Sequence, residues 1–233
     1  DVVSSQFSMH YYFRTEDTYK NFLQNLIDNV AVGGYFIGTC YNGMKIYNEF
    51  LELEKRKSTE ETSEETSEET SEETSEPSDK YPEKNYNKIS YVDTTGNIVY
   101  SIEKKYQLNN FDYSEDDIDN MFGTEIDVYM DSIGQTITEY LVNFDFFKDS
   151  MEKVGFELKT PDNVPKKHST ILRSDYMEDG LGSFRQIIEK IPELKESDKE
   201  FNKFYSEASG MGTNPFLQRL SSFNNYFIFQ RKE

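Results

Sequence analysis

The sequence opens with Asp1–Phe13, DVVSSQFSMHYYF, and continues through a helical pattern into Gly33–Thr39, GGYFIGT. Two β-branched valines begin a short strand of buried character, Asp1–Ser5. Thr15–Val32 has apolar residues at helical spacing and ends before a Gly-Gly pair, after which Tyr35–Thr39 is predicted to be a second strand. Strand, amphipathic helix and strand make a βαβ unit, so we expect the two strands to be parallel.

A polar and aromatic cluster follows the first strand directly. It contains Gln6, Phe7, His10 and Tyr11, and α/β proteins place ligands at such strand ends. On its own, His10 could be a buried core histidine, a general base or a hydrogen-bond donor to a ligand. Its aromatic neighbours favour a planar heterocycle as the ligand.

The rest of the chain alternates helical and strand patterns. A helix is predicted over Met44–Lys57, and a β-hairpin is predicted over Ile89–Tyr106 with a turn around Gly96. Further elements are predicted in this order: strands at Ile126–Met130 and Thr138–Phe144, a helix at Asp145–Val154, a strand at Phe156–Lys159, helices at Gly182–Ile191 and Asp198–Ala208, a hinge at Gly210–Gly212 and a closing strand at Phe223–Gln230. A parallel unit followed by hairpins predicts an α/β fold, a doubly wound sheet with an antiparallel edge.

Composition narrows the possible functions. The 233 residues carry a net charge of −19, which argues against a long basic surface for a nucleic-acid duplex. Ser58–Glu76 is an acidic TSEE repeat without apolar residues, and we expect the insertion from residue 58 to 86 to be disordered. The single cysteine, Cys40, excludes an internal disulfide and favours an intracellular protein. No stretch has the apolar length of a membrane span.

Motifs for common cofactors are missing from the sequence. It contains no P-loop, HExxH, CxxC, GxSxG or GxGxxG, and neither His10 nor His168 has partners at metal-ligand spacing. We therefore predict no metal site. Glu139, in TEYLVNF, could be a surface or capping residue, or it could accept two parallel N–H bonds. Guanine presents such a pair on N1 and on its exocyclic amine, whereas adenine does not.

These residues carry a family resemblance. DVVSSQFSMHYYF followed by GGYFIGT resembles the signature of mRNA cap guanine-N7 methyltransferases, and TEYLVNF, FFKDSMEKVGFEL and FNNYFIF follow in the family's order. The amino-acid sequence of these segments is more similar to the capping enzymes of large DNA viruses than to cellular ones. The resemblance implies the C-terminal part of a Rossmann-like, S-adenosylmethionine-dependent methyltransferase sheet, with antiparallel edge strands and helical insertions. Residues 1–233 would then be a partial methyltransferase domain.

The resemblance also implies roles for individual residues. Phe7, His10, Tyr11 and Glu139 would bind the cap guanine, and Gln6 would lie beside the adenosine part of the methyl donor. The family's guanine-contacting tyrosine near the last strand aligns with Asn224; Tyr226 is our prediction for that role, and Phe223 competes with it. All of these are positioning residues, with no acid–base catalyst and no metal.

Further consequences concern the whole protein. The family's glycine motif for the donor, its ribose-binding acid and its basic contacts to the cap phosphates precede this signature, so the chain alone is expected to bind the donor poorly and to be inactive. The resemblance implies capped mRNA 5′ ends as substrate, upstream capping domains, an activating subunit in some relatives, and a location in viral factories, virions or host cytoplasm. Two alternatives stay open: a methyltransferase for another acceptor, and a non-catalytic interaction module with a methyltransferase-like fold.

Overall fold

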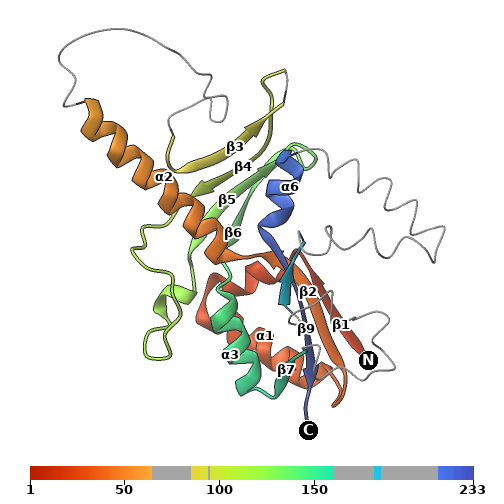
Figure 1. Cartoon of the computed structure of the whole chain (residues 1–233). Helices are drawn as coiled ribbons and strands as arrows, with labels where there is room; N and C mark the ends of the chain where they lie inside the picture. Colours follow the sequence, from red (N-terminus) through yellow and green to blue (C-terminus); the bar gives the residue numbers. More distant parts are fainter. Residues whose placement is uncertain (65–84, 94, 160–180, 185–214) are drawn as a thin grey trace.

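The predicted βαβ unit forms at the N-terminus of the chain (Figure 1). The computed structural model describes residues 1–64, 85–93, 95–159, 181–184 and 215–233. Strand β1 (Val2–Gln6), helix α1 (Glu16–Asn29) and strand β2 (Tyr35–Tyr41) follow one another, and the two strands are parallel, with Gln6 opposite Thr39. Thr15 caps α1 through a reciprocal pair of hydrogen bonds with Thr18, which explains why the helix begins there.

The first sheet has the order β1-β2-β9-β7, and β8 also pairs with β9. The predicted closing strand is confirmed as β9 (Asn224–Arg231), which runs antiparallel to β2. Strands β7 (Phe156–Leu158) and β8 (Leu181–Ser183) lie along its other edge. The expectation that the first strand is buried was wrong, because β1 lies at the edge of this sheet and the side chain of Val2 is exposed.

Aromatic side chains fill the space between the first sheet and the helices α1 and α3 (Phe144–Lys153), which Figure 1 shows on one face of it. The rings of Phe147 and Phe227 are 5.2 Å apart at 78°, an edge-to-face geometry that aromatic pairs favour. The side-chain oxygen of Asn143 accepts hydrogen bonds from the first turn of α3 and fixes where the predicted helix begins.

The later hairpins build a second sheet of their own, which the sequence pattern did not separate from the first. It is antiparallel, in the order β3 (Lys88–Val92), β4 (Ile98–Lys104), β5 (Glu125–Met130) and β6 (Gln135–Tyr140). Gly96 has a φ of 88° in the predicted turn between β3 and β4. Two short 3-10 helices also form: η1 (Met9–Arg14) follows β1, and η2 (Asp119–Met121) precedes β5.

Helix α2 (Gly43–Glu64) follows β2 directly and runs beside the second sheet (Figure 1). Its predicted end at Lys57 was too early, because the helix continues into the acidic repeat. The hydroxyl groups of Ser58 and Thr59 donate to the carbonyls four residues back, so these polar residues are satisfied inside a helix. The remainder of the predicted disordered insertion, residues 65–84, lies outside the described residues.

Two features of the C-terminal third differ from the prediction. Leu181–Ser183 forms strand β8 where the start of a helix was expected, and helix α6 (Pro215–Ser222) precedes β9 without having been predicted. The rest of the first predicted helix, the second predicted helix, the Gly210–Gly212 hinge and His168 lie outside the described residues.

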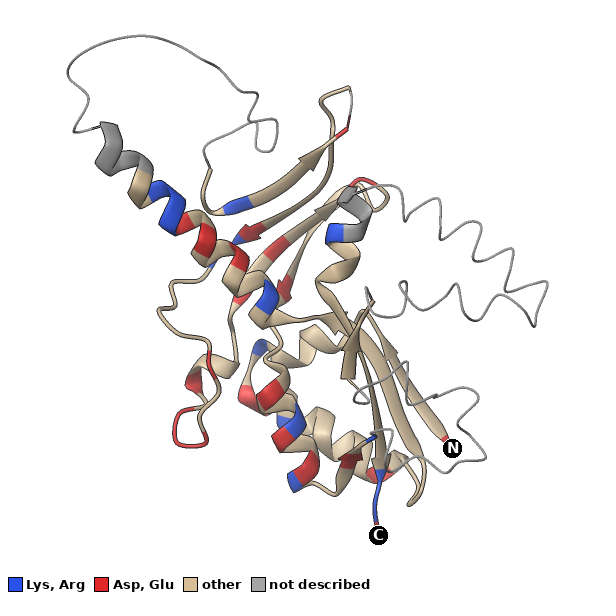
Figure 2. Ribbon diagram, viewed as in Figure 1, with Lys and Arg blue, Asp and Glu red and all other residues tan. Residues whose placement is uncertain are grey.

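Acidic and basic side chains alternate along α1 and α2, whereas the strands of the first sheet carry few charges (Figure 2). None of the helices described is long and apolar enough to cross a membrane.

The two sheets meet where β2 passes into α2. The backbone N–H of Gly43 donates to the carbonyl of Val142, which follows β6, over 2.8 Å. A Cβ atom on Gly43 would lie 2.7 Å from that carbonyl oxygen and 2.8 Å from the Phe111 ring. Only glycine therefore allows this approach of the two chain segments.

Gly43→Ala should separate the two sheets at this junction. We expect a loss of about 1–3 kcal/mol in the free energy of unfolding, the usual cost of overpacking a well-filled site. Thermal or denaturant unfolding measures it, with the exposed Gln24→Ala on α1 as a control that should change little. Wild-type stability in the Gly43 variant would contradict the proposed constraint.

Candidate functional site

The predicted site begins where β1 ends and the chain reverses at Phe7. Phe7 has a φ of 51°, and it is the one non-glycine residue with a positive φ among those described. A left-handed conformation costs such a residue about 1–2 kcal/mol, and the hydrogen bond from its N–H to the Thr39 carbonyl, 2.8 Å long, holds it there. Its ring is 54% exposed and contacts Phe184 edge-on. Backbone strain that presents an exposed aromatic ring at a strand end is typical of a binding site.

The helix η1 turns His10 inward and Tyr11 outward. His10 is only 3% exposed, whereas Tyr11 is exposed to solvent, and the two rings are 4.2 Å apart. Burial lowers the pKa of His10 to about 4. The imidazole is therefore neutral at physiological pH, with one N–H donor and one acceptor nitrogen.

Glu139 reaches the same place from β6 of the second sheet. Its Oε1 lies 3.7 Å from Nε2 of His10, which is too long for a hydrogen bond, and its side chain is 12% exposed. Burial raises the pKa of Glu139 to about 7. The Gly43–Val142 hydrogen bond ties the end of β6 to the first sheet and so fixes this meeting of Glu139 with His10.

Both partners keep hydrogen-bonding capacity unused. Within the described part of the chain, neither ring nitrogen of His10 has a hydrogen-bond partner, and Oε2 of Glu139 also has none. A buried polar atom without a partner costs about 1–3 kcal/mol, so native proteins keep such groups where a ligand completes them. The pair can offer a carboxylate and a neutral imidazole to one planar polar molecule.

Gln6 lies at the same end of the sheet and is already partly engaged. Its Oε1 accepts a hydrogen bond from the Thr39 hydroxyl over 2.8 Å, and its Nε2 donates to the Ser4 hydroxyl over 2.9 Å. One amide hydrogen remains for a ligand. Gln6 is exposed, so it can donate one hydrogen bond to a ligand beside the first strand, but it cannot form several.

Tyr226 is not brought to the His10–Glu139 pair. Its ring covers Gly182 of β8, where an added Cβ would lie 2.1 Å from the hydroxyl oxygen. Because β8 and β2 lie on opposite sides of β9, this hydroxyl points away from β2. Phe223, the competing residue, is buried at the start of β9.

The structure adds two residues that sequence reasoning did not select, Tyr41 and Asn224. They lie opposite each other in the β2–β9 pairing. Burial and the nearby Glu139 carboxylate raise the pKa of the Tyr41 hydroxyl. Asn224 is buried, and among the described residues its Oδ1 has no hydrogen-bond partner. The sequence signal for Asn224 is its alignment with the family's guanine-contacting tyrosine.

Metal ligands are not grouped in this region. No cluster of three or more His, Cys, Asp or Glu side chains able to hold a metal ion occurs in the described part of the chain. Cys40, in β2 near Glu139, is fully buried, and burial raises the pKa of its thiol.

The sequence of this chain is similar to those of proteins that act in mRNA capping. Residues 1–87 match the model of the mRNA (guanine-N(7))-methyltransferase domain, and this range contains Gln6, Phe7, His10 and Tyr11. A probable mRNA-capping enzyme of Acanthamoeba polyphaga mimivirus is 25% identical over 99% of this chain. The mRNA cap guanine-N(7) methyltransferases of Aspergillus oryzae and Saccharomyces cerevisiae are 35% and 24% identical over 68% of it.

The chain spans 17% of the mimivirus protein and 29% and 28% of the two fungal proteins. The signature strand and turn that the family model matches also form the exposed aromatic wall and the buried imidazole of the site. The fold is that of a methyltransferase α/β domain, and residues 1–87 belong to the mRNA (guanine-N(7))-methyltransferase domain family, with a viral capping enzyme among the relatives of the chain.

Proposed function

We propose that this chain forms the guanine-binding part of an mRNA cap guanine-N7 methyltransferase. The observation that carries the proposal is the buried His10–Glu139 pair, whose hydrogen-bonding atoms are left unused by the described residues. Guanine displays two donors, on N1 and on the exocyclic amine, beside the acceptor O6. The Glu139 carboxylate matches the two donors, and the neutral His10 imidazole supplies a donor for O6.

Stacking is the second component of the proposed binding. Tyr11 and Phe7 are the exposed aromatic side chains beside the pair. A flat base held between aromatic groups gains about 1–3 kcal/mol per stacked base, whereas the carboxylate selects guanine over adenine. Tyr226, which leans over β8, would need to move to join this contact, and Asn224 is the better placed of the two residues.

The chemistry needs positioning more than proton transfer. S-adenosylmethionine, the donor that the family implies, supplies an electrophilic methyl group on a positively charged sulfur. Guanine N7 has a free lone pair and loses no proton when it is methylated, so no residue has to act as a general base. His10, Glu139 and Tyr11 would hold the ring in line with the methyl group, and such alignment can contribute about 7–11 kcal/mol to the barrier reduction. Gln6 would contact the donor with its remaining amide hydrogen.

The whole protein would supply what these residues do not. We propose capped 5′ ends of mRNA as the substrate, and further capping domains in the same polypeptide, since the mimivirus relative is much longer than this chain. An activating subunit and a viral factory or host cytoplasm as the place of action belong to the same proposal.

Glu139→Ala should remove guanine recognition. Loss of two hydrogen bonds to a charged acceptor is expected to weaken cap binding by about 3 kcal/mol, roughly a hundredfold. Binding of the dinucleotide GpppA to the complete protein, measured by calorimetry, checks this, with donor binding expected to stay unchanged. Glu103→Ala, on the exposed side of the same sheet, serves as the control. Undiminished cap methylation by the Glu139 variant would refute the assignment.

Cap binding should weaken at acidic pH because of Glu139. The carboxylate form binds guanine, and the free protein protonates this group with a pKa of about 7 instead of the usual 4.5. The affinity for GpppA should therefore be constant above pH 8 and fall about tenfold per pH unit below pH 7. Titrations at several pH values test this. A flat profile between pH 5.5 and 8 would show that Glu139 does not read the guanine edge.

His10→Ala should reduce cap methylation about tenfold by the same factor at every pH between 5.5 and 8, because His10 is neutral throughout that range. His10→Gln, which retains an N–H donor, should recover part of the activity. The measurement is the pH profile of kcat/KM for the two variants and the wild type. Disappearance of a rate-controlling ionisation in the alanine variant would instead indicate general-base chemistry.

A further inference from the structure

A second polar site lies beside the proposed guanine site, along helix α2. It is a cavity of about 520 Å³. Helix α2 forms one wall, and β8 and the junction between α6 and β9 form the other. Its lining includes Lys45, Glu49, Glu52, Arg56, Ser222 and Phe223. The α2 members fall three, four or seven residues apart, so they share one face of the helix.

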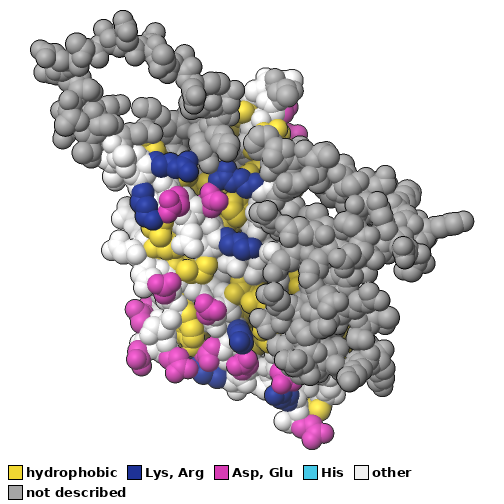
Figure 3. Space-filling model, viewed as in Figure 1, with side chains coloured by type: hydrophobic (Ala, Val, Ile, Leu, Met, Phe, Trp, Pro, Cys, Tyr) yellow, Lys and Arg dark blue, Asp and Glu magenta, His cyan; other side chains and the backbone are white. Residues whose placement is uncertain are grey.

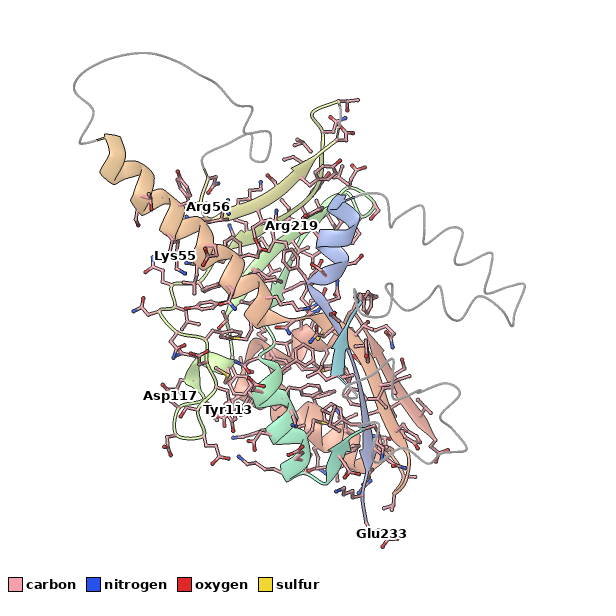
Figure 4. All side chains as sticks on the ribbon, in the orientation of Figure 1. Lys55, Arg56, Tyr113, Asp117, Arg219 and Glu233 are labelled. Carbon is pink, nitrogen blue, oxygen red and sulfur yellow. The ribbon has the colours of Figure 1, made fainter. Side chains whose placement is uncertain are left out.

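Charges in this cavity do not cancel. The Glu49 carboxylate forms an ion pair with the Arg219 guanidinium of α6, with a nitrogen–oxygen distance of 2.5 Å. The Glu52 carboxylate pairs with the Lys55 ammonium, with a nitrogen–oxygen distance of 2.6 Å. Lys45 and Arg56 have no salt bridge to any described residue. Arg56 also lies near Glu52, whose pKa Lys55 and Arg56 both lower. Counted together with Arg219 and Lys55, the cavity has four basic side chains against two acidic ones, on a chain whose net charge is −19. Figure 3 shows basic side chains gathered over α2 and its neighbours, and Figure 4 shows Arg56 and Arg219 on facing elements.

The Lys45 ammonium is held in place by neutral acceptors, so its positive charge is available to an anion. Its Nζ donates to the Ser222 carbonyl at 2.7 Å and to Oδ1 of Asn225 at 3.2 Å, both neutral acceptors. Partial burial lowers its pKa, because the charged ammonium is less well solvated there. An ammonium carries three donors, so one remains for a ligand. A phosphate oxygen in the cavity would satisfy that donor and restore the lost solvation.

The cavity and the proposed guanine site lie near each other at the start of β9. Phe223 lines the cavity, and the next residue, Asn224, pairs with Tyr41 at the end of β2, near Glu139. From Lys45 to Arg56 the helix rises roughly 16 Å, long enough for at least two phosphates of an extended strand. A nucleotide chain leaving the guanine site can therefore follow α2.

We propose that this cavity binds the phosphates of the first nucleotides of single-stranded RNA that follow the cap. The inference rests on the proposed function and extends it from the cap guanine to the transcript. Lys45 would contact a phosphate near the cap, and Arg56 would contact one further along. The site is short and electrostatic, so it would add affinity without reading sequence.

The test compares ligands of different length on the complete protein by fluorescence anisotropy. The ligands are the dinucleotide GpppA, a capped ten-nucleotide RNA and the same RNA without a cap. At low salt we expect the capped RNA to bind about tenfold more tightly than GpppA. Two phosphate contacts to a single strand give a salt slope of about −1.4, so this gain should fall roughly sevenfold between 50 and 200 mM salt.

Arg56→Gln should reduce the length-dependent gain and bring the slope to about −0.7, with unchanged affinity for GpppA. Lys148→Gln is the control: it removes the same charge from an exposed position of α3, outside the cavity lining, and should keep the full gain. Lys45→Gln should act like Arg56→Gln. Arg56 is the more informative position, since loss of Lys45 also removes two internal hydrogen bonds.

The outcomes separate this inference from the proposed function. Equal affinity for GpppA and the capped RNA would overturn the RNA site while leaving guanine binding intact. A gain that survives the combined Lys45→Gln and Arg56→Gln changes would also overturn it. If GpppA fails to bind but the uncapped RNA binds in a manner dependent on Arg56, the RNA site stands and the guanine assignment fails.

Discussion

The contact between Gly43 and Val142 decides how the two sheets of this protein meet. The aromatic segment with His10 follows β1 of the first sheet, and Glu139 lies on β6 of the second sheet. Neither sheet alone contains both halves of the polar pair. A backbone hydrogen bond, made at a position where only glycine fits, helps to bring a residue from late in the chain to within 3.7 Å of His10. A second backbone hydrogen bond, from Gly123 to the Phe13 carbonyl over 2.9 Å, ties the helix that carries His10 to the segment before β5.

The site contains features that lower the stability of the protein and leave groups available for a ligand. Phe7 is in a left-handed conformation, and His10 and Glu139 are buried with polar atoms unused by the described residues. Each of these features costs free energy in the unliganded protein. The aromatic core between the first sheet and helices α1 and α3 is large enough to tolerate them. Pre-formed, unsatisfied groups bind a rigid planar base without reorganisation, which is the situation that favours positional catalysis.

Local sequence signals predicted the parts of the fold that depend on near neighbours. The parallel βαβ unit, the start of its helix near Thr15, the β-hairpin around Gly96 and the closing strand all follow from periodicity and turn chemistry. Division into two sheets did not follow, because it depends on long-range strand pairing, such as that of β9 with β2. Strand β8 was mistaken for a helix because its three residues are too short to show a period, and their pairing with β9 decides their conformation.

Among the site residues, His10 and Glu139 could be selected from the resemblance, but their mutual distance could not. Tyr226 was favoured because residues two apart share a face of a strand, and that is true of Asn224 and Tyr226 here. The face of a strand on which a residue lies does not determine toward which neighbouring strand its long side chain points. Gly182 leaves open space above β8, and the Tyr226 ring occupies it.

The position at which the acidic repeat joins the fold has an evolutionary consequence. Helix α2 ends at Glu64, roughly 30 Å along the helix from Gly43. Each four-residue copy of the repeat brings two carboxylates. Copies added after Glu64 would enter the chain at this far end of α2, and salt screens exposed charges that lie more than about one Debye length apart. The length of this segment can therefore drift between related lineages while the guanine site keeps its geometry.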